Sequence, residues 1–209
     1  MASHPDRRAI PSQIAEIVSR RHRAEGVDLL CGIKIAGIEE LPGELRITLA
    51  GGHMIAADLL VIGIGAAPNT GLAEAAGLAI ENGIAVDSYL RTSDPDIFAA
   101  GDCCSYPLSL YGGRRVRLES WRNAHEQGTL AAANMMGCQE QITAVRWFWS
   151  DQYDLTLQIA GLAEGAVTQV RRDMEAGALI LFNLDPEGRL IAASGIGPGN
   201  AVCPRHPPG

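Results

Sequence analysis

Apolar side chains near the start of the chain recur at the spacing of a helix. They do so across 10–25, with Pro11 in the first turn and Gly26 just beyond the end. Proline is tolerated in the first turn of a helix and glycine commonly follows the last, so this pattern predicts a helix over the range. The short apolar segment over 27–31 predicts a strand directly after it.

The next segment alternates between apolar and other side chains, as a half-buried strand does. Isoleucine and leucine residues alternate between Ile33 and Leu49, which predicts strands on either side of a turn at Pro42-Gly43. A second turn at Gly51-Gly52 leads to a third short strand over 53–57. Together these elements predict an antiparallel meander.

A different pattern follows, in which consecutive positions are apolar. The run Leu-Leu-Val-Ile over 59–62 ends at Gly63-Ile64-Gly65. A strand that is apolar on both faces is typical of a buried parallel sheet, so we expect one here. The sequence GIGAAP over 63–68 is not a dinucleotide-binding fingerprint, because its sixth position is proline and no good helix follows at once.

Glycines punctuate the elements expected in the middle of the chain. Gly77 follows a short helical pattern and Gly137 follows an Ala-rich one, as expected of residues that end helices. The expected elements, in chain order, are a helix over 72–76, strands over 84–86 and 97–100, a polar loop containing Arg114, Arg115 and Arg117, and a helix over 123–136.

The last third of the chain has the alternating pattern of antiparallel strands. The sequence Asp-Pro-Glu-Gly over 185–188 is typical of a hairpin turn, and the Pro- and Gly-rich tail over 197–209 is expected to be irregular. The expected strands cover 147–149, 155–159, 167–170, 179–184 and 190–193.

Composition and charge exclude several classes of protein. Hydrophobic residues make up 47% of the chain and charged residues 20%, which is typical of a folded globular protein. The formal charge of −7 argues against general binding to nucleic acid or to an anionic membrane. No apolar run reaches the roughly 18 residues of a membrane helix, and the polar start over 1–8 does not resemble a signal peptide. A cytoplasmic location is therefore expected.

The cysteines and histidines do not form a recognisable metal or dithiol motif. The 5 cysteines are odd in number and contain no CxxC pair, which favours a reducing compartment and unpaired thiols. His22, His53 and His125 are scattered, without carboxylates or cysteines at the spacing of metal ligands. No metal site is expected.

The segment LRTSDPDIFAAGD over 90–102 carries the most chemistry. Ligands of open α/β sheets bind beyond the carboxyl ends of strands, and the small residues before Asp102 permit close approach to the backbone. Asp102 offers a carboxylate that can accept hydrogen bonds from a pair of ligand hydroxyls. From the pattern alone, an aspartate that caps a helix or closes a turn is the favoured interpretation.

Four runs in fixed order resemble the FAD-dependent, NAD(P)H-using ferredoxin reductases, the family of putidaredoxin and rhodocoxin reductases and of the reductase components of aromatic-ring dioxygenases. The runs are IGIGAAPNTGLAEAAGL, NGIAVDSYLRTSDPDIFAAGD, VRLESWRNAHEQGTLAAANMMG and WFWSDQYDLTLQIAGL. The resemblance implies an α/β chain: part of the two-domain FAD- and NAD(P)-binding fold of pyridine nucleotide-disulfide oxidoreductases, followed by an α+β reductase C-terminal domain with an antiparallel sheet. It covers nearly everything from about Ile10 to Ile196.

The resemblance also implies roles for the positions that match the family's motifs. Asp102, after Gly101, looks like the carboxylate that binds the ribityl chain of FAD. The sequence Glu119-Ser120-Trp121 resembles the helix start whose backbone meets the pyrimidine end of the flavin ring. Trp149 looks like the aromatic residue that the C-terminal domain places near flavin and nicotinamide, and Gly63-Ile64-Gly65 resembles a loop that a bound nicotinamide nucleotide passes closely.

Some residues near these positions have a second interpretation. Without the resemblance, Trp147 and Trp149 are interpreted as lying on alternate faces of a strand. His125 can face the edge of the flavin, but a surface position on the helix is the favoured interpretation. The arginines that cluster near the expected flavin site form either a solvated loop or a docking surface for an acidic ferredoxin; they are Arg114, Arg115, Arg117 and Arg122.

The sequence lacks the family's two GxGxxG fingerprints, one for FAD and one for NAD. We therefore expect three partial domains: the rear half of the NAD(P)-binding domain over 1–65, the rear segment of the FAD-binding domain over 66–137, and a truncated reductase C-terminal domain over 142–209. The expected function is electron transfer from NAD(P)H through FAD to a [2Fe–2S] ferredoxin. Alternatives are a non-catalytic fragment that acts as a folded or dimerising module, and another branch of the superfamily, such as a nitrite-reductase-type or apoptosis-inducing-factor-like flavoprotein. A homodimer is possible under either.

Overall fold

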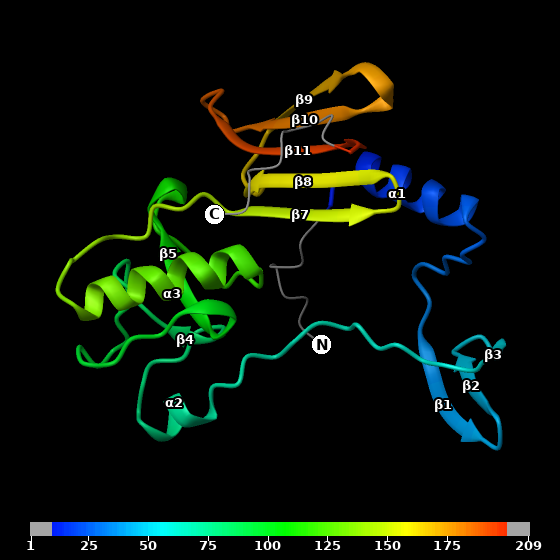
Figure 1. The fold of residues 1–209 in the computed structure, drawn as a ribbon, viewed down its shortest axis with the longest axis horizontal. Coiled ribbons are helices and arrows are strands. Elements are labelled where there is room, and N and C mark those ends of the chain that lie inside the picture. The colour runs from blue at the N-terminus through cyan, green and yellow to red at the C-terminus, as the bar shows by residue number, and fades with distance from the viewer. Residues whose placement is uncertain (1–9, 200–209) are drawn as a thin grey trace. The chain divides into compact units, whose positions relative to one another are not determined.

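The computed structural model describes residues 10–199, which form two compact units (Figure 1). The smaller unit covers 19–67, and the larger unit combines the residues before it with 68–199. The first turns of helix α1 (Ser12–Ala24) belong to the larger unit, and its last turns belong to the smaller unit. Each unit is described by itself below.

The smaller unit is built around the expected antiparallel meander. Strands β1 (Ile35–Leu41), β2 (Glu44–Leu49) and β3 (Met54–Ala57) follow one another in the sheet. Leu41 pairs with Glu44 across the turn at Pro42-Gly43, which confirms the hairpin. Alternate side chains of β2 are buried, because a half-covered sheet hides one face of each strand.

Two strands expected in this unit are not formed, so both predictions are wrong. Residues 27–31 and 59–62 have no helix or strand, and the side chains of Leu59 and Val61 are 77% and 84% exposed. A strand that is apolar on both faces is stable only between parallel neighbours and covering helices. The described residues of this unit supply no parallel neighbour, so the run at 59–62 stays extended and solvated.

The middle of the chain forms a small mixed sheet beside one long helix. Strands β4 (Ile84–Ala85), β5 (Cys104–Leu108) and β6 (Arg114–Val116) are adjacent in that order, the first pair parallel and the second antiparallel. Short turns of helix flank them: α2 (Gly71–Ala75), η1 (Gly101–Cys103) and η2 (Ser109–Tyr111). Helix α3, Trp121–Met135, runs alongside the sheet (Figure 1).

Two expectations for this region need correction. The segment 97–100 is not a strand; it makes one isolated bridge, between Arg91 and Phe98. The strand β5 instead begins after the Gly101-Asp102 turn. The expected polar loop around Arg114 contains strand β6, whose Val116 is 2% exposed and belongs to the core of this region. A single buried side chain and pairing with β5 are sufficient to make a strand of a segment rich in arginine.

The C-terminal region is a five-stranded antiparallel sheet, as the alternating pattern predicts. Its strands are adjacent in the order β7-β8-β11-β10-β9. The 185–188 turn is confirmed: the carboxylate of Asp185 accepts hydrogen bonds from the backbone N–H groups of Glu187 and Arg189. The strands are β7 (Trp147–Gln152), β8 (Leu155–Gly161), β9 (Thr168–Asp173), β10 (Leu179–Leu184) and β11 (Leu190–Pro198), with a turn η3 (Glu175–Gly177) before β10.

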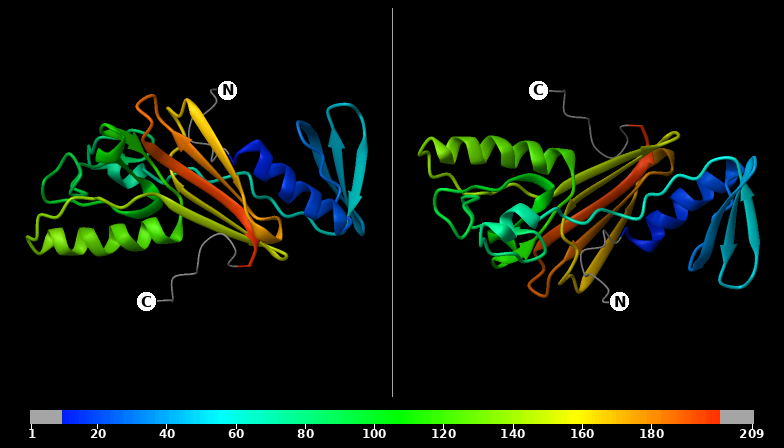
Figure 2. Two further views of the ribbon diagram at one scale, coloured as in Figure 1. Left: turned by 90° about the horizontal axis from the view of Figure 1, so that it is seen from above. Right: turned by 90° about the horizontal axis from the view of Figure 1, so that it is seen from below.

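The first turns of α1 cover one face of this sheet (Figure 2). Ile14 is completely buried there, among leucine and isoleucine side chains of β8, β10 and β11. Ile17 and Val18 pack against the same cluster, which explains the helical spacing of apolar residues in α1. Of the predicted irregular tail, 197–209, only the first residues lie within the described part of the chain, and Gly197 and Pro198 belong to β11.

Candidate functional site

A tight turn at Gly101 brings the Gly-Asp sequence against helix α3. Gly101 is buried and has a φ of +83°, a backbone conformation that favours glycine. A Cβ at this position would lie 3.5 Å from the Cβ of Ala124 on α3. The turn therefore packs closely on the first turns of α3, and the next residue, Asp102, extends to the surface beside it.

The carboxylate of Asp102 is available to a ligand. Its side chain is exposed, and among residues 10–199 no group donates a hydrogen bond to it. The backbone of the same residue is held, because the carbonyl of Asp102 accepts a hydrogen bond of 3.0 Å from Nη1 of Arg117. A fixed backbone with a free carboxylate is the arrangement that binding to ligand hydroxyls requires.

Helix α3 begins in the predicted sequence Glu119-Ser120-Trp121. Ser120 is the N-cap, and its Oγ accepts a hydrogen bond of 3.4 Å from the backbone N–H of Asn123. The first N–H groups of a helix carry partial positive charge and lack partners within the helix, so they suit a ligand that becomes negative. The start of α3 has these properties.

Arg117 joins the turn to the start of the helix. Its Nη1 donates both to the carbonyl of Asp102 and, at 2.6 Å, to Oε1 of Glu119. Arg117 and Glu119 are largely shielded, with side chains 11% and 30% exposed. The structure thus brings together four of the predicted positions, Gly101, Asp102, Glu119 and Ser120, and places Trp121 next to them in the chain.

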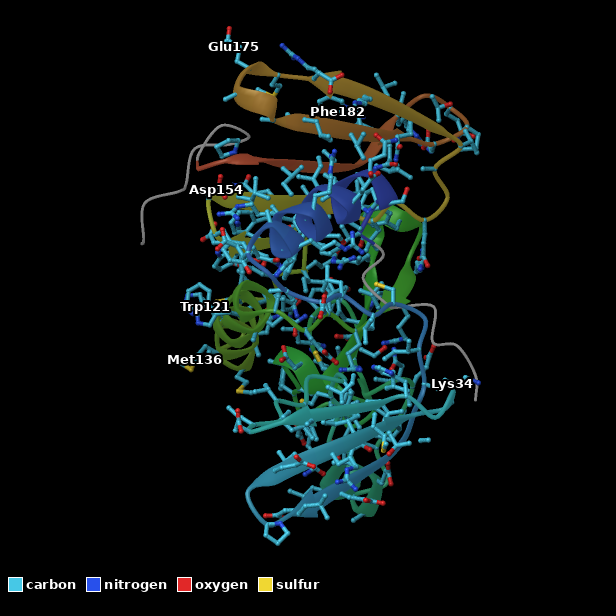
Figure 3. The ribbon with its side chains drawn as sticks, turned by 90° about the vertical axis from the view of Figure 1, so that its right-hand side faces the viewer. Lys34, Trp121, Met136, Asp154, Glu175 and Phe182 are labelled. Carbon is cyan, nitrogen blue, oxygen red and sulfur yellow. The ribbon has the colours of Figure 1, made fainter. Side chains whose placement is uncertain are left out.

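The ring of Trp121 lies on the outside of α3 (Figure 3). It is 72% exposed and stacks on the ring of His125, one helical turn away, at a centroid distance of 5.3 Å and an interplanar angle of 9°. His125 is also exposed, which agrees with the surface interpretation of that residue. The predicted role of Trp121 concerns its backbone N–H. The exposed ring is not part of the core.

The two tryptophans of β7 lie on the same face of the strand. Residues two apart point the same way in a strand, and the rings of Trp147 and Trp149 stack at 5.0 Å with an interplanar angle of 23°. The interpretation that they occupy alternate faces is therefore wrong. The guanidinium of Arg122, on the first turn of α3, lies 5.2 Å from the ring centre of Trp147.

A small pocket of about 10 Å³, room for roughly one water molecule, lies where the start of α3 meets β7. Ser120, Arg122 and Trp147 are among the residues that line it. Trp149 does not line this pocket but stacks on Trp147 at its edge and is 39% exposed. The ring of Trp147 therefore lies between the pocket and Trp149.

The remaining predicted position, Gly63-Ile64-Gly65, belongs to the smaller unit. It has no helix or strand, and Ile64 is 90% exposed. Gly65 has a φ of +97°, which explains a glycine at that point.

The four arginines of the expected cluster are each paired with a carboxylate. Arg115 contacts Glu81 at 3.1 Å and Arg122 contacts Glu126 at 2.6 Å, in addition to the pair of Arg117 with Glu119. Arg114 pairs with Glu164. A partner that docks here would meet alternating charges, so the surface has little excess positive charge to offer an acidic protein.

A buried polar network that the sequence pattern did not predict lies beneath the site. Gln127, which is 1% exposed, reaches from α3 to the Gly101 turn and to Cys104, and Tyr106 joins the same network through Asn123. The signal that could have revealed it is the four-residue spacing of Asn123 and Gln127 on an otherwise Ala-rich helix face. Burial raises the pKa of the Cys104 thiol to about 12, and burial also raises the pKa of Tyr106 above its usual range.

Comparison with known proteins identifies the family. A family model described as pyridine nucleotide-disulphide oxidoreductase matches residues 2–128, more than half of the chain. This chain belongs to that family. A second model, described as reductase C-terminal, matches residues 147–204 and so includes the five-stranded sheet. The resemblance to ferredoxin reductases and the predicted fold class are thereby confirmed.

The most informative relatives of this family member are ferredoxin reductases. The chain is 39% identical over 203 residues to the ferredoxin–NAD(+) reductase component of the anthranilate 1,2-dioxygenase system of Burkholderia cepacia, covering 93% of this chain and 48% of the relative. It is 41% identical over 180 residues to rhodocoxin reductase of Rhodococcus erythropolis, covering 85% and 42%. The chain spans about half the length of the curated relatives it matches.

Solved structures show the same relationship. The structure of the covalent putidaredoxin reductase–putidaredoxin complex matches with a TM-score of 0.83 and 34% identity over 93% of this chain and 47% of the reductase. A ferredoxin reductase of Rhodopseudomonas palustris, from the CYP199A2 system, matches with a TM-score of 0.82 and 34% identity over 90% and 47%. The arrangement of elements in this chain is therefore that of part of a ferredoxin reductase.

Two further properties of residues 10–199 bear on the site. None of their helices is both long and apolar enough to span a membrane. None of their His, Cys, Asp and Glu side chains gather in a group of three that could hold a metal ion.

Proposed function

We propose that this chain contributes the flavin-facing part of an oxidoreductase that moves electrons from NAD(P)H through FAD to a [2Fe–2S] ferredoxin. One observation supports this function most directly: the Gly101-Asp102 turn lies against the first turns of α3, and Arg117 bridges the two. The similarity to ferredoxin reductases supports the choice of electron donor and acceptor.

The residues of the site fit the flavin end of FAD. The free carboxylate of Asp102 would accept hydrogen bonds from ribityl hydroxyls, and the backbone N–H of Trp121 would meet the pyrimidine end of the ring. When bound, FAD supplies the ability to accept a hydride and to release electrons one at a time. This part of the chain supplies no pyrophosphate-binding fingerprint, so its contacts favour the ribityl and ring portions of the cofactor.

The chain's own groups would bind and orient the flavin and shield it from water. The partial positive charge at the start of α3 stabilises negative charge on a group held against it. Trp149, stacked on Trp147, would cover one side of the bound flavin with an apolar surface that excludes water. Gly63-Ile64-Gly65 would allow a nicotinamide nucleotide to pass close to the backbone, because glycine has no side chain to obstruct it.

The proposed partner is a [2Fe–2S] ferredoxin in the cytoplasm. A relative of this chain has been crystallised in covalent complex with putidaredoxin. Because Arg114, Arg115, Arg117 and Arg122 are each paired with a carboxylate, the proposal does not depend on them as a docking surface.

A second candidate function is a non-catalytic module that folds or dimerises without cofactor. The solvent-exposed apolar run over 59–62 favours it, since such a surface promotes association. The two candidates are separated by mixing the purified chain with excess FAD and then removing unbound cofactor. Retained flavin colour, followed by NADH-dependent reduction of an added [2Fe–2S] ferredoxin, is expected for the oxidoreductase. A colourless chain that forms a dimer would support the second candidate.

A further inference from the structure

Gln127 is a polar side chain that the core of the larger unit encloses almost completely. It lies on the inner face of α3 and is 1% exposed. Its Oε1 accepts a hydrogen bond of 2.7 Å from the backbone N–H of Gly101 and one of 3.0 Å from the Sγ of Cys104. These two donors come from residues on either side of Asp102, so one side-chain oxygen holds both ends of the turn that carries the carboxylate.

The other end of the Gln127 amide is held as well. Its Nε2 donates to Oδ1 of Asn123 at 3.2 Å, and the same oxygen accepts the hydroxyl hydrogen of Tyr106 at 2.8 Å. The Nδ2 of Asn123 donates to the carbonyl of Leu118 at 3.0 Å, which fixes the orientation of that amide. A flipped Gln127 would set its N–H groups against the N–H of Gly101, so only one orientation satisfies every group.

The turn needs such an anchor. Gly101 can adopt many backbone conformations, because it lacks a Cβ, and the exposed carboxylate of Asp102 makes no hydrogen bond among the described residues. Its position therefore depends on what holds its backbone. Arg117 holds the carbonyl of Asp102 from the side nearer the solvent, and Gln127 holds the N–H of Gly101 from the core.

We propose that Gln127 is a positioning residue, which fixes the Gly101-Asp102 turn against α3 through its contacts with the Gly101 N–H and the Cys104 thiol. The inference rests on the proposed function in one respect, that Asp102 binds FAD. The structural part of the proposal concerns this chain alone: without the Gln127 oxygen, the turn loses its anchor while the rest of α3 stays in place.

Two variants of the full chain test the proposal. Gln127→Leu keeps the approximate size of the side chain and removes the oxygen; Gln127→Glu keeps an oxygen that can accept from Gly101 and Cys104. The control is Thr129→Ala, an exposed change on the same helix. Amide hydrogen exchange at Gly101 measures the anchor directly. Exchange at Glu140, whose N–H donates to Oδ1 of the buried Asn134 at 2.7 Å, reports whether α3 remains folded.

In Gln127→Leu, we expect exchange at Gly101 to accelerate about tenfold or more, because a lost hydrogen bond exposes its donor, while exchange at Glu140 stays unchanged. The S–H stretching band of Cys104, isolated as the difference from Cys104→Ala, should shift toward that of a free thiol. Gln127→Glu should restore both signals, and Thr129→Ala should change neither. If Gln127→Leu unfolds the chain, Gln127→Glu decides, read against Glu140: while Glu140 stays protected, restored protection at Gly101 supports the anchor and lost protection refutes it.

FAD affinity adds the functional outcome. Gln127→Leu should weaken FAD binding about tenfold, the equivalent of one well-formed hydrogen bond. Unchanged protection of Gly101 in Gln127→Leu would overturn the proposal, as would unchanged FAD affinity when that protection is lost. If the wild-type chain does not bind FAD, the proposed function fails, and the exchange and infrared signals still decide whether Gln127 anchors the turn.

Discussion

Replacing Tyr111 with phenylalanine removes one hydroxyl from a junction between two regions of the larger unit. Tyr111 lies in η2, after β5, and its hydroxyl reaches the C-terminal sheet. It donates a hydrogen bond of 2.8 Å to the carbonyl of Ile191 and accepts one of 2.9 Å from the N–H of Leu162. Burial raises the pKa of this hydroxyl, so it remains a donor throughout the physiological range.

The expected cost follows from these two hydrogen bonds. Both partners are backbone groups, and Leu162 is only 7% exposed, so water cannot readily replace the lost hydroxyl. At about 1 kcal/mol for each hydrogen bond, Tyr111→Phe should lower the free energy of unfolding by about 2 kcal/mol. For a chain of this size, that corresponds to a decrease in Tm of about 4–8 °C.

The assay is thermal and urea unfolding of Tyr111→Phe beside a matched control, Tyr89→Phe. The hydroxyl of Tyr89 accepts one hydrogen bond of 2.8 Å, from Nε2 of Gln141 at the surface, so its loss should cost about 0.5 kcal/mol or less. If the two variants are equally stable, the Tyr111 hydroxyl does not join the regions as argued. An unchanged Tm for Tyr111→Phe would refute the reasoning outright.

Three further experiments test the packing of the larger unit. Gly161→Ala should unfold the chain or lower its stability by about 3 kcal/mol or more, because the new Cβ would lie 2.2 Å from the carbonyl of Ile191 at a φ of +77°; a soluble variant with an unchanged Tm would refute this. The pKa of Cys104 is raised from 9.0 to about 12, so its contribution to stability is complete below pH 9.0 and is lost as the pH rises toward 12. Cys104→Ala should flatten that decline in urea unfolding, and an identical slope in both proteins would contradict the burial argument. At neutral pH, peptide mapping should show Cys104 alkylated far more slowly than the exposed Cys138, with equal rates as the contrary result.

Local periodicity was sufficient to predict much of the C-terminal sheet. Strand β10 has the expected bounds of 179–184. Its alternating pattern lies between the η3 turn and the Asp185 turn. Hydrogen bonds between residues close in sequence set the geometry of the Asp185 turn. The helical spacing before Gly26 likewise predicts α1, since one apolar stripe is sufficient to place a helix on a sheet.

The sequence pattern was insufficient where pairing with a neighbouring strand determines whether a segment forms a strand. The run over 59–62 has the composition of a parallel strand but no parallel neighbour among the described residues, and β6 is a strand because β5 pairs with it. The predicted site residues Asp102 and Trp121 came from resemblance to a family, since a Gly-Asp turn alone also fits a simple cap. Gln127 was missed because its importance comes from tertiary contacts with Gly101 and Cys104.

The central claim is that the Gly101-Asp102 turn and the start of α3 form a binding surface for flavin. The most direct test is a titration of the purified chain with FAD, followed by quenching of flavin fluorescence, for the wild type, Asp102→Ala and the control Asp96→Ala, which removes another exposed carboxylate. We predict saturable quenching by the wild type and the control, and an affinity at least about tenfold lower for Asp102→Ala, since a charge-assisted hydrogen bond contributes about 1.5–3 kcal/mol. Equal affinity of all three proteins, or no binding by any, would contradict the account.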